Sequence, residues 1–208
     1  MSVSLYDAVR ASYGNRESKR NIESQGYVYD KDLSNHNEKV YYNKNDSKLL
    51  FLTAGTHNLS DWSVDRWLGS GHLKKTQRYQ GAKQKLNQAK EKYHPQKTVV
   101  AAHSLGGSIS QGIASRNDEV NTLDSGYTIG QTTRANTKEY RSQGDVVSLL
   151  GANAKHSTTL NHGNFFSRHK HAIAGALTLN PIALGIGLVS DAVRNHNVDN
   201  IKNEKIFV

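Results

Sequence analysis

The sequence predicts an α/β fold in which a mostly parallel β-sheet carries helices on both faces. Short apolar or β-branched runs alternate along the chain with segments of helical periodicity. Two of these runs, Lys48 to Thr53 and Lys97 to Ala102, are almost continuously apolar, which is typical of strands buried on both faces. The second run leads through a tight turn at Ser104 into a helical segment, Leu105 to Ser115. At 208 residues, we expect one domain, 1–208, with a single core.

The segment before the first central strand predicts small elements. Apolar positions within Ser2 to Ala11 favour a short helix, and the polar stretch Ser12 to Ser24 favours a loop. Gly26 to Tyr29 and Lys39 to Tyr42 are rich in β-branched and aromatic residues and predict short strands. The polar residues Asn43 to Ser47 then predict a turn.

A helix is expected from His72 to His94, where Pro95 ends it. Its apolar stripe has spacings of three and four and consists of Tyr79, Ala82, Leu86, Ala89 and Tyr93. The remaining surface carries seven Lys or Arg residues against the single acid Glu91. Such a run is usually a solvated face, but this imbalance suggests a docking surface for an anionic sheet or polymer, and we expect anionic lipid. The side chains that we expect to make this contact are Lys74, Lys75, Arg78, Lys83 and Lys85.

Beyond Ser115 the sequence predicts further strands at Glu119 to Leu123, Thr137 to Arg141 and Ser157 to Leu160. Asp124 to Gly126 predicts a turn after the first of these.

The last third contains nineteen consecutive uncharged residues, Ala172 to Ser190. That length matches a membrane span, but Asn180-Pro181 interrupts its centre and glycines weaken it. We therefore expect two short helices meeting at Pro181, in a basic and apolar helical insertion over residues 168–194 that packs in the core or touches a membrane.

Composition limits the possible functions. The chain has no cysteine, which excludes disulfides and thiol catalysis. A net charge of +9 and a pI near 9.6 favour phosphate-bearing partners, either anionic lipid or nucleic acid. We expect no specific nucleic-acid partner, because the charged face of the basic helix lacks interleaved aromatic side chains. Met1 to Arg20 is polar, so a cleaved secretory signal is not predicted.

The chemistry centres on Ala102-x-Ser104-x-Gly106. Small residues on either side of Ser104 allow a sharp strand-to-helix turn that lifts its hydroxyl clear of the sheet. The N–H of Leu105, at the start of the following helix, can donate to an oxyanion. The pattern differs from the Gly-x-Ser-x-Gly of α/β-hydrolases only in an alanine, which keeps the first position small.

A nucleophilic serine needs a base and a carboxylate to orient that base. Asp145 follows a predicted strand and a glycine, and Asp124, which also ends a strand, is the alternative acid. For the base we favour His196, because it lies in a loop after the last major helix. His162 and His169 are alternatives.

The histidines also allow a different interpretation. A metal could bind the histidine cluster, but no acidic or cysteine partner lies at ligand spacing. We therefore expect no metal and no cofactor. The cluster consists of His156, His162, His169 and His171.

Taken in order, several motifs resemble class 3 (fungal-type) lipases over about Lys48 to Asn200. They are Ala54-Gly55-Thr56, Asp61-Trp62 with Asp65, Ala102 to Gly107, Gly144 to Ser148, and His196. The resemblance implies that Thr56 supplies an oxyanion-hole donor beside the Leu105 N–H. The family commonly has Arg where this chain has Ala54. A weaker resemblance is to lipase-like proteins of large DNA viruses.

Together the residues and the resemblance predict a serine esterase of the lipase or phospholipase type, with Ser104, Asp145 and His196 as its triad, acting on anionic lipid. We expect a cytoplasmic or virion-associated protein with peripheral membrane contact. The alternative is a non-catalytic membrane-binding or virion-associated protein that keeps the same fold.

Overall fold

The computed structural model describes residues 2–56, 73–126, 134–142, 157–160 and 197–208. Within these residues the strands form one sheet, ordered β1 to β7 as in the sequence. β1 to β3 pair antiparallel, and β3 to β7 pair parallel, so the predicted mostly parallel α/β sheet is confirmed. The strands are β1 (Val28–Asp30), β2 (Glu38–Asn43), β3 (Lys48–Thr53), β4 (Lys97–His103), β5 (Glu119–Leu123), β6 (Thr137–Ser142) and β7 (Ser157–Leu160).

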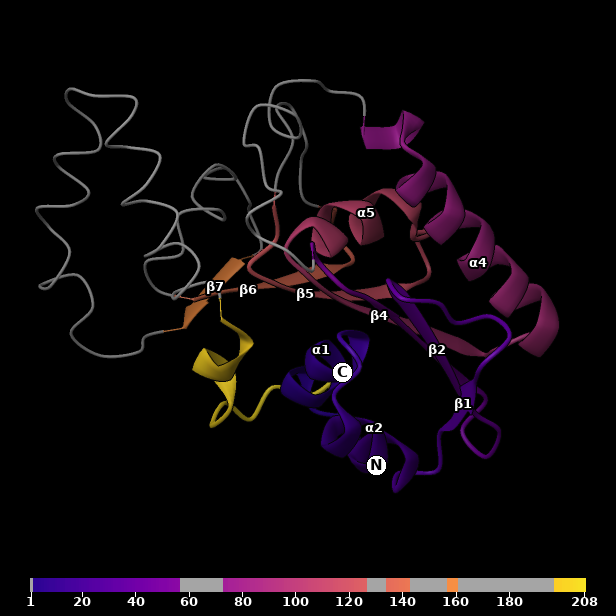
Figure 1. Ribbon diagram of the computed structural model, residues 1–208, viewed down its shortest axis with the longest axis horizontal. Coiled ribbons are helices and arrows are strands. Elements are labelled where there is room, and N and C mark those ends of the chain that lie inside the picture. Colours follow the sequence, from indigo (N-terminus) through magenta and orange to yellow (C-terminus); the bar gives the residue numbers. More distant parts are fainter. Residues whose placement is uncertain (1, 57–72, 127–133, 143–156, 161–196) are drawn as a thin grey trace, which may run out of the picture.

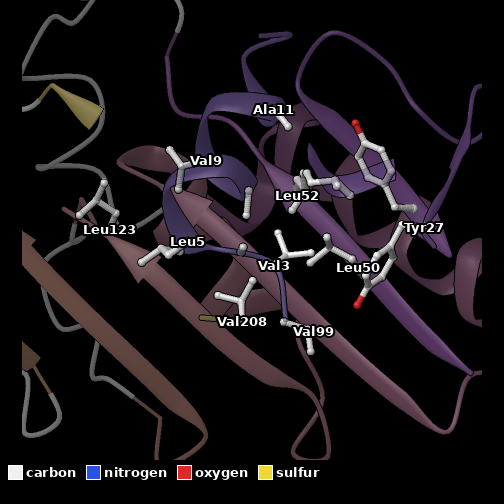
Figure 2. Packing of buried hydrophobic residues seen from close by; sticks show 14 of the residues in the cluster. Val3, Leu5, Val9, Ala11, Tyr27, Leu50, Leu52, Val99, Leu123 and Val208 are labelled. Atoms are coloured by element: carbon white, nitrogen blue, oxygen red, sulfur yellow. The ribbon is translucent and has the colours of Figure 1, made fainter. Parts of the chain in front are cut away.

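Helices cover both faces of this sheet (Figure 1). α1 (Leu5–Ser12) and α2 (Arg16–Glu23) lie on one face, and α4 (Gln77–Tyr93) and α5 (Leu105–Ile113) lie on the other. The alternation of β3 explains the two layers, because successive side chains of a strand point to opposite faces. Leu50 and Leu52 join the cluster around α1, which Figure 2 shows, whereas Leu49 and Phe51 join the cluster around α4 and α5.

The predicted loop at Ser12 to Ser24 is wrong, because helix α2 occupies most of it. The side chain of Asn15 caps this helix by accepting a hydrogen bond from the Ser18 N–H at 3.0 Å. Ile22 is its one large apolar residue and is fully buried. A good cap and a single anchor suffice here because α2 packs against α1.

The predicted helix at His72 to His94 begins later than expected. Thr76 caps α4 through its hydroxyl, and the preceding residues form a short 3-10 turn, η2 (Leu73–Lys75). His94 ends the helix in the left-handed region at φ 44°. The apolar stripe is confirmed, because its residues from Tyr79 to Ala89 are buried.

The C-terminal segment is tied to α1. Leu5 N donates to Ile206 O at 2.8 Å, and Val208 N donates to Val3 O at 2.8 Å. In η3 (Val198–Ile201), Ile201 is buried in the same cluster as α1. The chain that follows His196 is therefore anchored to the face of the sheet that α1 covers.

The predicted insertion at 168–194 lies outside the described residues. Among the helices that the structure does describe, none combines the length and apolarity that crossing a membrane requires.

Glu119 joins three strands at the edge of the sheet opposite Ser104. Its carboxylate lies 2.8 Å from Lys97 Nζ on β4 and 2.9 Å from Lys138 Nζ on β6. Burial on its own would raise the pKa of Glu119, but the hydrogen bonds from the two lysines lower it to about 2. The ionised carboxylate therefore stabilises the fold.

We predict that Glu119→Gln lowers the free energy of unfolding at pH 7 by about 1 kcal/mol, a modest value because the lysines are exposed. The pKa is depressed in the folded state, so the stabilisation is present above pH ~4.5 and disappears as the pH falls toward 2. Urea unfolding of both proteins between pH 7 and pH 3 measures this. If the difference in free energy of unfolding between the two proteins grew as the pH fell, the stabilising role of the ionised Glu119 would be contradicted.

Candidate active site

Ser104 occupies a strained turn between β4 and α5. Its φ of 54° and ψ of −129° lie in a region that residues other than glycine rarely adopt. Three backbone hydrogen bonds hold this conformation: Ser104 N donates to Leu123 O at 3.1 Å, and Ser104 O accepts from the N–H groups of Gly107 and Gly126. The predicted strand–turn–helix at Ser104 is confirmed.

The start of α5 lies directly against the end of β3. A Cβ atom on Gly106 would collide with the carbonyl oxygens of Thr53 and Ala54. Glycine is needed here for close backbone approach, because both neighbours are main chain and cannot move aside. Leu105 is the first residue of α5, so its N–H has no acceptor within the helix.

The turn after β3, Ala54-Gly55-Thr56, touches the serine. We name it the oxyanion loop, after the role that the family resemblance implies for Thr56. A Cβ atom on Gly55 would lie 2.8 Å from Ser104 Cβ and 2.6 Å from the hydroxyl of Tyr13. Within the described residues, neither the Ser104 Oγ nor the Thr56 Oγ1 has a hydrogen-bond partner, although both atoms are buried. The structure therefore brings Ser104, Leu105 and Thr56 together at the carboxyl edge of the sheet.

Two side chains that the sequence did not assign to this site hold the oxyanion loop. The Tyr13 hydroxyl, at the end of α1, accepts a hydrogen bond from Gly55 N at 2.8 Å and lies 2.7 Å from His103 Nδ1. Arg78 Nη2, on α4, donates to Ala54 O and, at 3.1 Å, to Gly55 O.

Lipid docking by Arg78 stays a prediction, and the structure gives its side chain contacts that the sequence did not suggest. Its side chain is half-buried against the oxyanion loop, and this burial lowers the pKa of Arg78 while the charge of Glu38 opposes the shift. The sequence held no signal that singled out Arg78, because Lys85 has the same spacing, four residues, before the buried Ala89.

The alternative acid, Asp124, has a structural role at the end of β5. Its carboxylate accepts hydrogen bonds from Ser142 N at 2.6 Å and Ser142 Oγ at 2.8 Å, which fixes the end of β6. Asp145, three residues after Ser142, lies outside the described residues, as do His196, His162 and His169. Their assignments stay predictions.

The exposed face of α4 and η2 contains two kinds of lysine. Lys90 pairs with Asp118 and Lys92 pairs with Asp30, so these charges are compensated. No ion pair with a described carboxylate compensates the others: Lys74, Lys75, Lys83 and Lys85. These four define the basic surface, which begins beside the oxyanion loop that Arg78 contacts.

In the described part of the chain, no group of three or more His, Cys, Asp or Glu side chains is arranged to hold a metal ion. The predicted histidine cluster lies outside that part.

The fold resembles that of solved lipases. It matches Lip2 lipase from Yarrowia lipolytica with a TM-score of 0.52 at 12% sequence identity, covering 76% of this chain and 77% of that one. A mutant form of MDLA from Penicillium cyclopium gives a TM-score of 0.50 at 12% identity, with 78% of each chain covered. The chain has a fungal lipase fold.

No protein-family model matches the chain, and no curated protein sequence matches it significantly. The resemblance to fungal-type lipases is thus confirmed for the fold, whereas that to viral lipase-like proteins stays a prediction.

The strain at Ser104 has a measurable consequence. We predict that Ser104→Gly is more stable than Ser104→Ala by about 1 kcal/mol, because only glycine adopts this conformation without a steric penalty. For a chain of this length the difference corresponds to roughly 2–4 °C in Tm by calorimetry. A less stable glycine variant would show that the turn is not strained.

Proposed function

We propose that this protein is a serine esterase that hydrolyses acyl esters of lipids, in the manner of a triacylglycerol lipase or a phospholipase A. The observation that carries the proposal is the buried hydroxyl of Ser104, held on a strained turn against the oxyanion loop. Strained backbone of this kind persists where the surrounding structure enforces it, and it clusters at active sites. The fungal lipase fold supports the same reaction class.

In the proposed mechanism, Ser104 Oγ attacks the ester carbonyl while His196 removes its proton, and Asp145 orients the imidazole. The Leu105 N–H and Thr56 stabilise the negative charge that develops on the carbonyl oxygen. His196 then gives its proton to the leaving alcohol, and water hydrolyses the acyl-enzyme by the same steps in reverse.

The anchoring of η3 supports His196 as the base. Asp199, three residues after His196, accepts a hydrogen bond from Tyr6 on α1 at 3.1 Å. The same helix ends at Tyr13, which contacts the oxyanion loop. Three residues span at most about 10 Å, so His196 directly precedes a segment that is tied to the helix bordering the site.

The basic surface supports a membrane as the place of reaction. Lys74 and Lys75 lie at the end of α4 that borders the oxyanion loop, and both are exposed. An anionic headgroup layer bound there would bring ester bonds toward Ser104. We propose that the uncharged segment at 172–190 contacts the acyl chains.

The competing possibility is a non-catalytic membrane-binding protein with the same fold. It shares the basic surface but requires no strained serine. Hydrolysis distinguishes the two functions directly.

We predict that the wild-type protein hydrolyses p-nitrophenyl butyrate and is labelled at Ser104 by a fluorophosphonate, and that Ser104→Ala abolishes both. Loss of the nucleophile lowers kcat by several orders of magnitude, whereas the fold is retained because the side chain is small. The release of p-nitrophenol measures hydrolysis, the mass of the intact protein measures labelling, and circular dichroism measures whether the fold is retained. A wild-type protein that is neither active nor labelled would favour the non-catalytic alternative.

The same assay separates the candidate bases. His196→Ala should reduce kcat about as strongly as Ser104→Ala, while the alanine variants of His162 and His169 keep most of the activity. If instead one of those two variants is inactive and His196→Ala is active, the base has been assigned to the wrong histidine.

We predict that changing Lys74, Lys75, Lys83 and Lys85 together to Gln weakens sedimentation with phosphatidylglycerol vesicles, and that added salt weakens wild-type binding. Each lysine near such a surface contributes about 1 kcal/mol, which salt screens.

The matched control changes four exposed lysines elsewhere to Gln and alters net charge by the same amount. This control variant should bind the vesicles like the wild type. The lysines changed in it are Lys31, Lys44, Lys202 and Lys205. Equal losses in both quadruple variants would mean that overall charge, and not the basic surface, governs binding.

A further inference from the structure

We propose that Tyr13 and Arg78 are positioning residues that together orient the oxyanion loop for catalysis. This inference rests on the proposed esterase function and extends it to two residues outside the triad. The two side chains come from α1 and α4, which cover opposite faces of the sheet (Figure 1). They meet the same few backbone atoms, at Ala54 and Gly55.

The two contacts hold both polar groups of one peptide unit. Ala54 C=O and Gly55 N–H belong to the same planar peptide and point in opposite directions. Arg78 donates to the carbonyl oxygen, while Tyr13 accepts from the N–H at 2.8 Å. Rotation of this peptide plane would break one contact or the other, so its orientation is fixed from both sides.

Arg78 also controls the next peptide unit. Its second hydrogen bond, 3.1 Å to Gly55 O, determines the direction of the Thr56 N–H, because that N–H lies opposite Gly55 O in the same plane. The Thr56 N–H therefore points away from the guanidinium. Oxyanion donors must be oriented before the reaction, since reorientation during it would consume the stabilisation that they provide.

The guanidinium adds an electrostatic effect. A cation that donates to a peptide oxygen polarises the peptide and makes its N–H a stronger donor. Arg78 lies in a half-buried position, where the charge of the buried carboxylate of Glu38 partly balances it. Charge-assisted hydrogen bonds in such surroundings are stronger than neutral ones.

Tyr13 links the loop to the residue before the nucleophile. Its hydroxyl accepts from Gly55 N and also shares a hydrogen bond with His103 Nδ1 at 2.7 Å, whose direction follows the tautomer of the imidazole. Burial raises the pKa of Tyr13 to about 12, so the hydroxyl keeps its proton throughout any practical assay. One hydroxyl thus couples the oxyanion loop to the end of β4.

The test compares Arg78→Met, Arg78→Lys and Tyr13→Phe with two matched controls. Arg134→Met removes an arginine that donates to a backbone carbonyl, Ala114 O, far from the site. Tyr79→Phe removes a tyrosine hydroxyl that donates to Gly112 O at 2.8 Å. Each control therefore breaks a hydrogen bond between the same type of side chain and the backbone, and any general loss of packing should appear in it as well.

We expect Arg78→Met and Tyr13→Phe to lower kcat on p-nitrophenyl butyrate by about 10- to 100-fold with KM almost unchanged, because the loop acts on the transition state. An alkyl boronic acid, whose tetrahedral adduct carries the oxyanion, should bind more weakly by a similar factor. Arg78→Lys keeps the charge and should recover part of kcat. The two controls should match the wild type.

Two outcomes overturn the inference in distinguishable ways. If the wild type hydrolyses esters and the test variants lose no more kcat or boronate affinity than the controls, the esterase function stands and the positioning role falls. If the wild type neither hydrolyses esters nor reacts with a fluorophosphonate, both fall. Tyr13→Phe removes a single oxygen atom, so it remains informative even if Arg78→Met does not fold.

Discussion

The close approach of two backbone segments is the constraint on which the site depends. The turn after β3 and the first residues of α5 are in direct contact, and only the missing side chain of Gly106 allows it. Because β3 and β4 are parallel neighbours, their carboxyl ends lie at the same edge of the sheet. The oxyanion loop therefore meets Ser104 without any side chain between them, and the site is built mainly from main chain.

Main-chain sites need side chains that hold them, and these come from both faces of the sheet. Tyr13 reaches the loop from the α1 layer and Arg78 from the α4 layer. Asp124 performs a similar task one strand farther along by fixing Ser142 at the end of β6. The two packed layers hold α1 and α4 in place. Hydrogen bonds from these helices to the backbone of the oxyanion loop then fix the conformation of the loop.

Charge is divided between structure and surface in the same way. Some charges form ion pairs that stabilise the fold. Glu119 on β5 pairs with Lys97 on β4, and two lysines of α4 pair with Asp30 and Asp118. The lysines of the basic surface have no such described partner and lie on η2 and α4, which begin near the oxyanion loop. This separation explains how a chain with a net charge of +9 forms a stable core while one exposed face stays strongly basic.

The sequence by itself determined the succession of strands, the turn at Ser104 and the apolar stripe of α4, whereas it missed α2. These follow from local periodicity and from the small residues that a sharp turn needs. Only the tertiary structure decided which residues from distant parts of the sequence come into contact. The pattern could not place Tyr13 beside Gly55, since that contact joins residues 42 positions apart. Nor could it separate Arg78 from the lysines around it, because the same charge can face water or a backbone carbonyl, and only the packing of α4 selects between them.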